Sequence, residues 1–251
     1  KMNSFFLYLP FNAPHVSSSL EPEIRGTVQA PPEYLEVYPE GTSVKEQKRR
    51  GYMAAVTCMD NAIGNVLRLV DSLHLAENTM VIFLSDNGGG TGSDNSPFSG
   101  AKATMWEGGI RVPCIIKWPG VIKQGQVIDN FLSSLEIFPT ILAATGINKP
   151  DSLKLDGFDM LPLLKQEKNL ERVEMFWEQR EEYAARIGTM KWIHSQNRKN
   201  NNGLFDLIND PGELNDLSNR EIEEFNRVKD KFHKWQKEMS EAEPRGPFKD
   251  F

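Results

Sequence analysis

Apolar residues recur at three- and four-residue steps in two long stretches of the chain. The first stretch carries this stripe at Tyr52, Val56, Met59, Ile63, Val66, Val70 and Leu73, and the last carries it at Ile222, Phe225, Val228, Phe232, Trp235 and Met239. Such spacing is typical of a helix that turns one face to a core. Ser43 with Glu46, and Ser218 with Glu221, precede these stretches as Ser-x-x-Glu, in which each side chain satisfies a backbone donor of the other residue. The pattern predicts two amphipathic helices with capping boxes.

Short apolar runs predict the strands of a mixed sheet. Residues 1–10 read as a buried strand, and residues 79–84 follow the first helix in the α-then-β order typical of a doubly wound fold. Residues 111–118 predict another strand. An apolar helix is predicted at 137–144, after a third Ser-x-x-Glu pattern and before the stop signal of Gly146. The fold class expected here is α/β, part of a doubly wound mixed sheet with flanking helices.

The pattern changes near residue 149. Strand-like runs at 173–177, 184–194 and 203–207 precede the final amphipathic helix. Strands followed by one such helix predict a small antiparallel sheet with the helix packed on it. We therefore predict two domains: residues 1–148, part of an α/β domain, and residues 149–251, a small α+β subdomain.

Composition limits the function classes. The chain has 251 residues, 39% hydrophobic and 25% charged, with a net charge of −6. The lack of a basic excess argues against nucleic-acid binding. No apolar run is long enough to span a bilayer. The two cysteines, Cys58 and Cys114, make neither a disulfide framework nor a zinc site, and each is expected to be a buried free thiol in its apolar stretch.

The strand at 79–84 ends abruptly in Ser-Asp-Asn-Gly-Gly. Asp86 and Asn87 offer hard oxygen ligands, suited to calcium or magnesium, at the edge where open α/β sheets place their sites. An Asp-Asn-Gly turn that merely ends the strand is the alternative, and the tripeptide alone favours it. The glycine-rich segment at 100–113 shifts the interpretation toward a metal edge.

Lys102 follows Gly100, which lets the backbone approach a ligand closely. An ammonium near a divalent cation is unfavourable unless an anion lies between them. Lys102 near Asp86 and Asn87 therefore implies a bound sulfate or phosphate group. A surface lysine is the alternative for an isolated residue. Glu107 and the arginine four residues later are interpreted as a scaffold pair.

His15 stands just past the first predicted strand. If the strands run parallel, it lies on the same edge as Asp86, where a histidine can donate a proton to a leaving group. An incidental loop histidine is the alternative.

Seven segments occur in the order found in one known family: residues 5–15, 52–67, 85–89, 100–113, 139–142, 155–157 and 203–217. Together they resemble the carboxyl-terminal half of a type I, formylglycine-dependent sulfatase of the alkaline phosphatase superfamily. The resemblance implies that Asp86 and Asn87 ligate calcium, in preference to magnesium. It implies that Lys102 contacts the sulfate and the nucleophile's oxygen, and that His15 binds sulfate and assists the leaving group.

The family's nucleophile is a formylglycine made from Cys/Ser-x-Pro-x-Arg, and neither Cys58 nor Cys114 stands in that motif. The resemblance therefore implies an upstream amino-terminal half as partner, and no turnover by this chain alone. It implies a sulfated small molecule or glycan as substrate, and export to the periplasm or the exterior. The alternatives are a phosphodiesterase or phosphonate hydrolase of the same superfamily, and a non-catalytic fragment that binds sulfated glycans.

Overall fold

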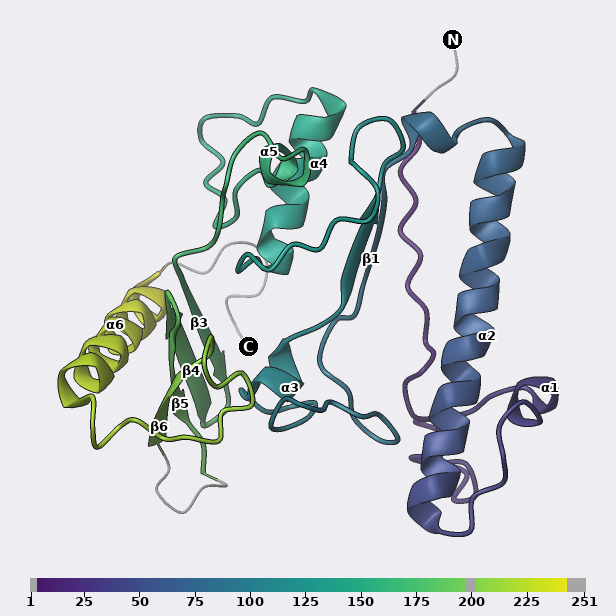
Figure 1. Cartoon of the computed structure of the whole chain (residues 1–251), viewed down its shortest axis with the longest axis horizontal. Coiled ribbons are helices and arrows are strands. Elements are labelled where there is room, and N and C mark those ends of the chain that lie inside the picture. The colour runs from purple at the N-terminus through teal and green to yellow at the C-terminus, as the bar shows by residue number, and fades with distance from the viewer. Residues whose placement is uncertain (1–3, 197–201, 243–251) are drawn as a thin grey trace. The chain divides into compact units, whose positions relative to one another are not determined.

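The computed structural model describes residues 4–196 and 202–242 (Figure 1). The chain divides into two compact units, Lys1–Asn78 with Gly89–Asn95, and Thr79–Gly88 with Ser96–Phe251. The domain boundary expected at residues 148 and 149 stays a prediction, since compact units need not coincide with domains.

The first unit is built on the long helix α2, Val44–Ser72. Its predicted capping box is confirmed: the Glu46 amide donates to Ser43 Oγ, and the Ser43 amide donates to Glu46 Oε2 at 2.9 Å. These bonds and those from Thr42, the largest contribution, lower the pKa of Glu46. The short helix α1, Pro32–Leu35, lies against α2, whose residues Gly51, Ala54 and Ala55 are buried.

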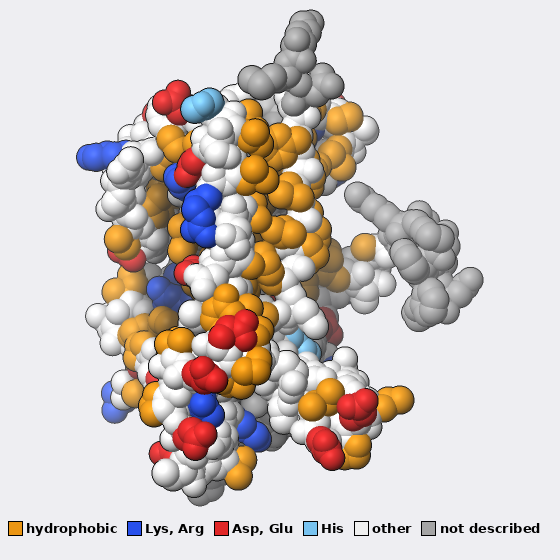
Figure 2. Space-filling view, turned by 90° about the vertical axis from the view of Figure 1, so that its right-hand side faces the viewer, with side chains coloured by type: hydrophobic (Ala, Val, Ile, Leu, Met, Phe, Trp, Pro, Cys, Tyr) orange, Lys and Arg blue, Asp and Glu red, His pale blue; other side chains and the backbone are white. Residues whose placement is uncertain are grey.

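The buried strand predicted at 1–10 is not formed by the described residues. Residues 4–12 adopt no regular secondary structure. The side chains of residues 5–9 are exposed, and the exposed fraction of Phe6 is 76%. A strand needs a neighbour that takes up its backbone hydrogen bonds, and no described strand pairs with this segment. Figure 2 shows hydrophobic side chains gathered in a band on the face that it draws.

The second unit begins with a two-stranded sheet. Strand β1, Val81–Leu84, comes shortly after the 3₁₀ turn η1, Ala76–Asn78, and pairs antiparallel with β2, Cys114–Lys117. The short helix α3, Glu107–Ile110, lies between the two strands in sequence. Both predicted strands are confirmed. Cys114 is exposed, so the expectation of a buried thiol is wrong for it. The reason is that three of the four residues of β2 are exposed, because little of the described chain covers this strand.

The predicted apolar helix is α4, Ile137–Thr145, which continues from the 3₁₀ turn η2, Ser134–Glu136. Its capping box is present, and Gly146 ends the helix in the left-handed region at φ +67°. Glu136 is buried and forms an ion pair with Arg172. A further short helix, α5, Leu161–Leu164, lies against α4.

The carboxyl-terminal sheet has four antiparallel strands in the order β3-β4-β5-β6: Glu174–Gln179, Glu182–Ile187, Met190–His194 and Asn202–Asp206. The run at 184–194, interpreted as one strand, is a hairpin, because Gly188 at φ +58° reverses the chain. Helix α6, Ile222–Glu241, packs on β4 and β5 (Figure 1). The predicted sheet with one packed helix is therefore confirmed.

The capping box predicted at Ser218 and Glu221 is wrong. Helix α6 begins after Glu221, whose side chain makes no capping bond. The Ser218 amide donates to Asp216 Oδ1 at 2.9 Å, and the amides of Arg220 and Glu221 donate to Leu217 O. These bonds close a separate turn before the helix, so serine is too far upstream to cap it.

Phe232 of α6 is fully buried against the sheet, with ring centroids 5.1 Å from Trp192 and 5.3 Å from Tyr183. We expect Phe232→Ala to lower the free energy of unfolding by about 3–5 kcal/mol, through lost burial and the cavity left behind. Urea unfolding followed by tryptophan fluorescence measures it. Met239→Ala, at a half-exposed position of the same helix, serves as control and changes stability by about 0.5 kcal/mol or less. Equal losses in the two variants would contradict this account of the core.

Candidate active site

Asp86 and Asn87 lie directly after the carboxyl end of β1, as predicted. The Asp86 side chain is exposed, and no described residue binds its carboxylate. Asn87 Nδ2 donates to Gly88 O at 2.9 Å, and Ser85 Oγ donates to Asn87 O at 2.8 Å. The amide nitrogen of Asn87 is therefore held locally, and the Asp86 carboxylate beside it has no described partner.

Gly88, directly after Asn87, lies against Gly108 and Gly109, which follow Lys102 in the chain, and the contact is between backbone atoms. The Gly88 amide donates to Gly109 O at 2.8 Å, and the Gly108 amide donates to Ser99 O at 2.7 Å. A Cβ atom at Gly88 would lie 1.9 Å from Gly108 O, and one at Gly109 would lie 2.2 Å from Thr104 O. Only glycine permits this approach. The structure thus brings the Asp86 segment together with the loop that carries Lys102, residues 99–109, which we call the Lys102 loop.

Lys102 lies in a tight turn. The Thr104 amide and hydroxyl both donate to Ala101 O, at 3.1 and 2.7 Å, and the Ala101 amide donates to Thr104 Oγ1 at 3.2 Å. Ala103 occupies the left-handed region at φ +69°, which costs an alanine about 1–2 kcal/mol. The Lys102 side chain is exposed and forms no ion pair with the described part of the chain. The turn therefore presents its ammonium to the outside.

The residues after the turn anchor it in the carboxyl-terminal sheet. Met105 is buried in a cluster with Ile193 and Phe205, and the Trp106 ring lies 5.5 Å from the Phe205 ring. The Lys102 loop thus has a rigid support on one side.

A buried charge cluster includes Glu107, at the end of the Lys102 loop. Lys191 Nζ of β5 is 2.8 Å from Glu107 Oε1 and 2.8 Å from Glu213 Oε1. The predicted scaffold pair is present, with Arg111 Nη1 3.7 Å from Glu107 Oε2. Burial raises the pKa of the Glu213 carboxyl, and the ammonium of Lys191 opposes part of that rise. Sequence reasoning gave no role to Lys191 or to Glu213, although Glu213 lies in the family segment 203–217, because nothing in the sequence shows that the two side chains meet Glu107.

His15 belongs to the first unit, whereas Asp86, Asn87 and Lys102 belong to the second. The expectation that His15 shares their edge stays a prediction. His15 is exposed, and its Nδ1 atom lies 2.8 Å from Val16 O. Because Nδ1 donates to Val16 O, the Nε2 atom carries a lone pair in the neutral ring and a proton in the imidazolium.

The residues present fit a divalent cation of the calcium type in part. One carboxylate and one carboxamide oxygen are hard ligands, and calcium takes six to eight such oxygens. Within residues 4–196 and 202–242, no three His, Cys, Asp or Glu side chains gather as a metal site. Two such oxygens fall short of a calcium shell, so a calcium site here would need further oxygen ligands from other residues.

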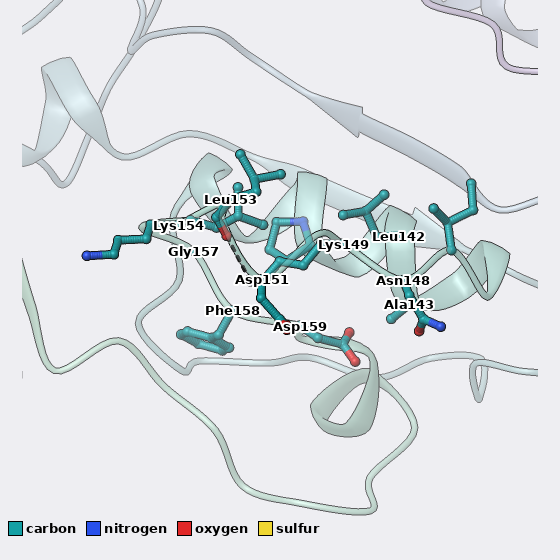
Figure 3. A pocket seen from close by; sticks show the side chains of 13 residues that line it. Leu142, Ala143, Asn148, Lys149, Asp151, Leu153, Lys154, Gly157, Phe158 and Asp159 are labelled. Atoms are coloured by element: carbon teal, nitrogen blue, oxygen red, sulfur yellow. Dashed lines mark hydrogen bonds between the residues drawn. The ribbon is translucent and has the colours of Figure 1, made fainter. Parts of the chain in front are cut away.

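A pocket of about 700 Å³ lies beside the carboxyl end of α4 (Figure 3). Its lining mixes apolar side chains such as Leu142 with charged ones, and Lys149 Nζ donates to Leu153 O across it at 2.8 Å. None of the four predicted site residues lines it. The pocket is thus separate from the candidate active site.

Comparison with known proteins identifies the family. The family described as "Sulfatase" matches residues 1–147, and that described as "N-sulphoglucosamine sulphohydrolase, C-terminal" matches residues 100–242. The chain therefore belongs to the sulfatase family. The predicted resemblance and α/β fold class are confirmed.

The similarity extends to proteins of known structure and activity. The chain is 42% identical to steryl-sulfatase of Homo sapiens over 124 residues, 45% of this chain and 21% of that protein. It is 33% identical to N-acetylgalactosamine-6-sulfatase of Homo sapiens over 193 residues, 74% of this chain and 33% of that protein. The crystal structure of Ps i-CgsB in complex with k-i-k-neocarrahexaose matches with a TM-score of 0.79 and 27% identity, over 94% of this chain and 50% of that chain. The chain thus spans a half or less of these proteins.

Proposed function

We propose that this chain forms one part of a sulfatase that hydrolyses sulfate esters of a sugar or an aryl alcohol. The observation that carries the proposal is the close backbone contact of Gly88 with Gly108 and Gly109, which holds the Asp86–Asn87 segment against the Lys102 loop. Family membership supports the reaction class. The ammonium and the two hard oxygen ligands support an anionic ester as substrate.

In this proposal, each of the four residues has one task. Asp86 and Asn87 would hold a calcium ion, which when bound supplies positive charge to the sulfate oxygens. Lys102 adds a second positive charge and orients the sulfate group. His15, as the imidazolium that is protonated at both ring nitrogens, donates the Nε2 proton to the departing alcohol oxygen as the sulfur–oxygen bond breaks.

The nucleophile is proposed to be a formylglycine in a sulfatase segment outside this chain. The matched part is 49% and 50% of the two solved chains. Each of these chains therefore has a further part of similar length, and the proposal places the formylglycine in the corresponding part of this protein. The complete protein is proposed to act outside the cell or in the periplasm. Among the described residues, no helix is long and apolar enough to cross a membrane.

A sugar sulfate is the favoured substrate class, because the neighbour at 27% identity binds an oligosaccharide. The comparisons give no support to a phosphodiesterase or a phosphonate hydrolase. The test is sulfate release by the full-length protein from its source, measured by ion chromatography with sulfated oligosaccharides and 4-nitrophenyl sulfate. 4-Nitrophenyl phosphate is the control ester. Turnover of the phosphate in preference to every sulfate would overturn the proposal.

We expect Asp86→Ala in the full-length protein to weaken calcium binding at least tenfold and to lower turnover with it. Loss of one carboxylate removes a charged ligand from the shell. Calorimetric titration of the metal-free protein with calcium measures the affinity without reference to activity. Asp151→Ala, in the separate pocket beside α4, is the control and leaves calcium affinity unchanged. Equal affinity in Asp86→Ala and the parent protein would remove Asp86 from the metal site.

A further inference from the structure

A single turn, at Gly212 and Glu213, contacts both ends of the loop that carries Lys102. At the beginning of the loop, Ser99 Oγ donates to Gly212 O at 2.6 Å. At its end, the Glu107 amide donates to Glu213 Oε2 at 2.7 Å. Because both ends are held by one rigid turn, the loop between them has few conformations to adopt.

The Glu213 carboxylate is fixed in its turn by the buried cluster. Lys191 Nζ lies 2.8 Å from it and 2.8 Å from Glu107, and the side chains of Lys191 and Glu213 are fully buried. Buried charges persist only when they are paired, and the pairing depends strongly on geometry. The two carboxylates and one ammonium leave one negative charge, which Arg111 balances from the half-exposed side.

The backbone at Glu213 is strained. Its φ of +56° lies in the left-handed region, which residues with a Cβ atom rarely adopt. Gly212, directly before it, could adopt the left-handed conformation without strain, but it is Glu213 that adopts it. Such strain persists where the side chain is needed and its surroundings hold it in place. Asp210 helps to hold it, since its carboxylate accepts the amides of Leu214 and Asn215 at 3.0 and 2.7 Å.

We propose that Glu213, paired with Lys191, is a positioning residue for the hydrolysis of sulfate esters. It acts through Glu107, whose amide it accepts, to fix the turn of Lys102 beside the Asp86 segment, while Gly212 of the same turn accepts from Ser99. This inference rests on the proposed function. Its physical basis is that catalytic groups must be held within a fraction of an ångström, by neighbours whose own geometry is locked.

The first test is Glu213→Gln in the full-length enzyme. The carboxamide keeps the shape of the side chain but carries no charge, so it loses the ion pair with the Lys191 ammonium that fixes it, and its bond to the Glu107 amide is weakened. We expect kcat/KM for 4-nitrophenyl sulfate to fall at least tenfold in a protein that stays folded by circular dichroism. The control is Lys231→Met, which breaks a 2.7 Å ion pair with Glu174 on the same sheet, away from the loop, and leaves kcat/KM unchanged.

The second test separates positioning from a general loss of structure. Glu213→Gln is introduced into Lys102→Ala, and the residual turnover is measured with concentrated enzyme. If Glu213 acts through Lys102, the second substitution adds less than twofold. An undiminished tenfold loss in the Lys102→Ala background would show a merely structural role and overturn the proposal.

A third measurement does not depend on turnover. Hydrogen exchange followed by mass spectrometry reports the amides of Glu107 and Gly108, which donate to Glu213 and Ser99. We expect faster exchange there in Glu213→Gln and no change within α6. Unchanged exchange at the loop would overturn the proposal. If the parent protein hydrolysed no sulfate ester, the proposed function would fail and the positioning role with it, while faster exchange would still show that Glu213 holds the loop.

Discussion

In the full-length enzyme, Lys102→Ala is expected to lower kcat/KM for sulfate esters by about 10²–10³, a loss typical of removing one charge-stabilising group from an active site. The turn at 101–104 is closed by bonds between Ala101 and Thr104, none of which uses the lysine side chain. The side chain is exposed and pairs with no described residue. The fold should therefore persist while turnover is lost, and steady-state kinetics with 4-nitrophenyl sulfate together with a thermal unfolding midpoint measure both.

Two further variants sharpen this prediction. Lys102→Arg keeps the charge but replaces a compact ammonium with a planar, longer group, so it should recover only part of the loss. Lys123→Ala removes an exposed lysine outside the site motifs and is expected to leave kcat/KM unchanged. Activity of Lys102→Ala equal to that of Lys123→Ala would make Lys102 a surface lysine, which is the alternative that the sequence left open.

Local features of this fold were predictable from the sequence. The capping boxes at Ser43 and Ser133 depend on residues three positions apart, and both formed. The Asp86–Asn87 pair stands at a strand end because a short apolar run stops there. Ser218 shows the limit of such patterns, because Asp216, two residues upstream, engages its amide and the helix starts later.

Features that join distant segments were not predictable. The cluster of Glu107, Lys191 and Glu213 brings together three parts of the chain, and Lys191 reads in the sequence as an ordinary polar strand residue. The strand predicted at 1–10 failed for a related reason: an apolar run predicts burial, but its partner strand must come from elsewhere. In the sequence, the Gly108–Gly109 pair indicates no more than a tight turn before the next strand. Its close contact with Gly88 appears only in three dimensions.

That contact gives the second large expected effect, from Gly88→Ala. The added Cβ atom would lie 1.9 Å from Gly108 O and 2.8 Å from Gly109 Cα, and both are backbone atoms that no side-chain rotation can move. The two segments must separate by about 1 Å, and a displacement of that size at a catalytic site costs about 100-fold in rate. We expect kcat/KM to fall by about that factor, and stability to fall by about 1–3 kcal/mol from the overpacking.

Gly64→Ala is the matched control, since it adds the same methyl group elsewhere in the chain. Gly64 lies inside α2, and its added Cβ would lie 3.3 Å from the flexible end of Arg68, which can move away. Alanine also favours the helix by about 1 kcal/mol relative to glycine, so this variant should be as active as the parent and equally or more stable. Kinetics and urea unfolding of the two variants decide the matter. A fully active Gly88→Ala would mean that the close backbone contact of Gly88 does not set the distance between the Asp86 segment and the Lys102 loop, and the proposed site would lose the contact that joins its two parts.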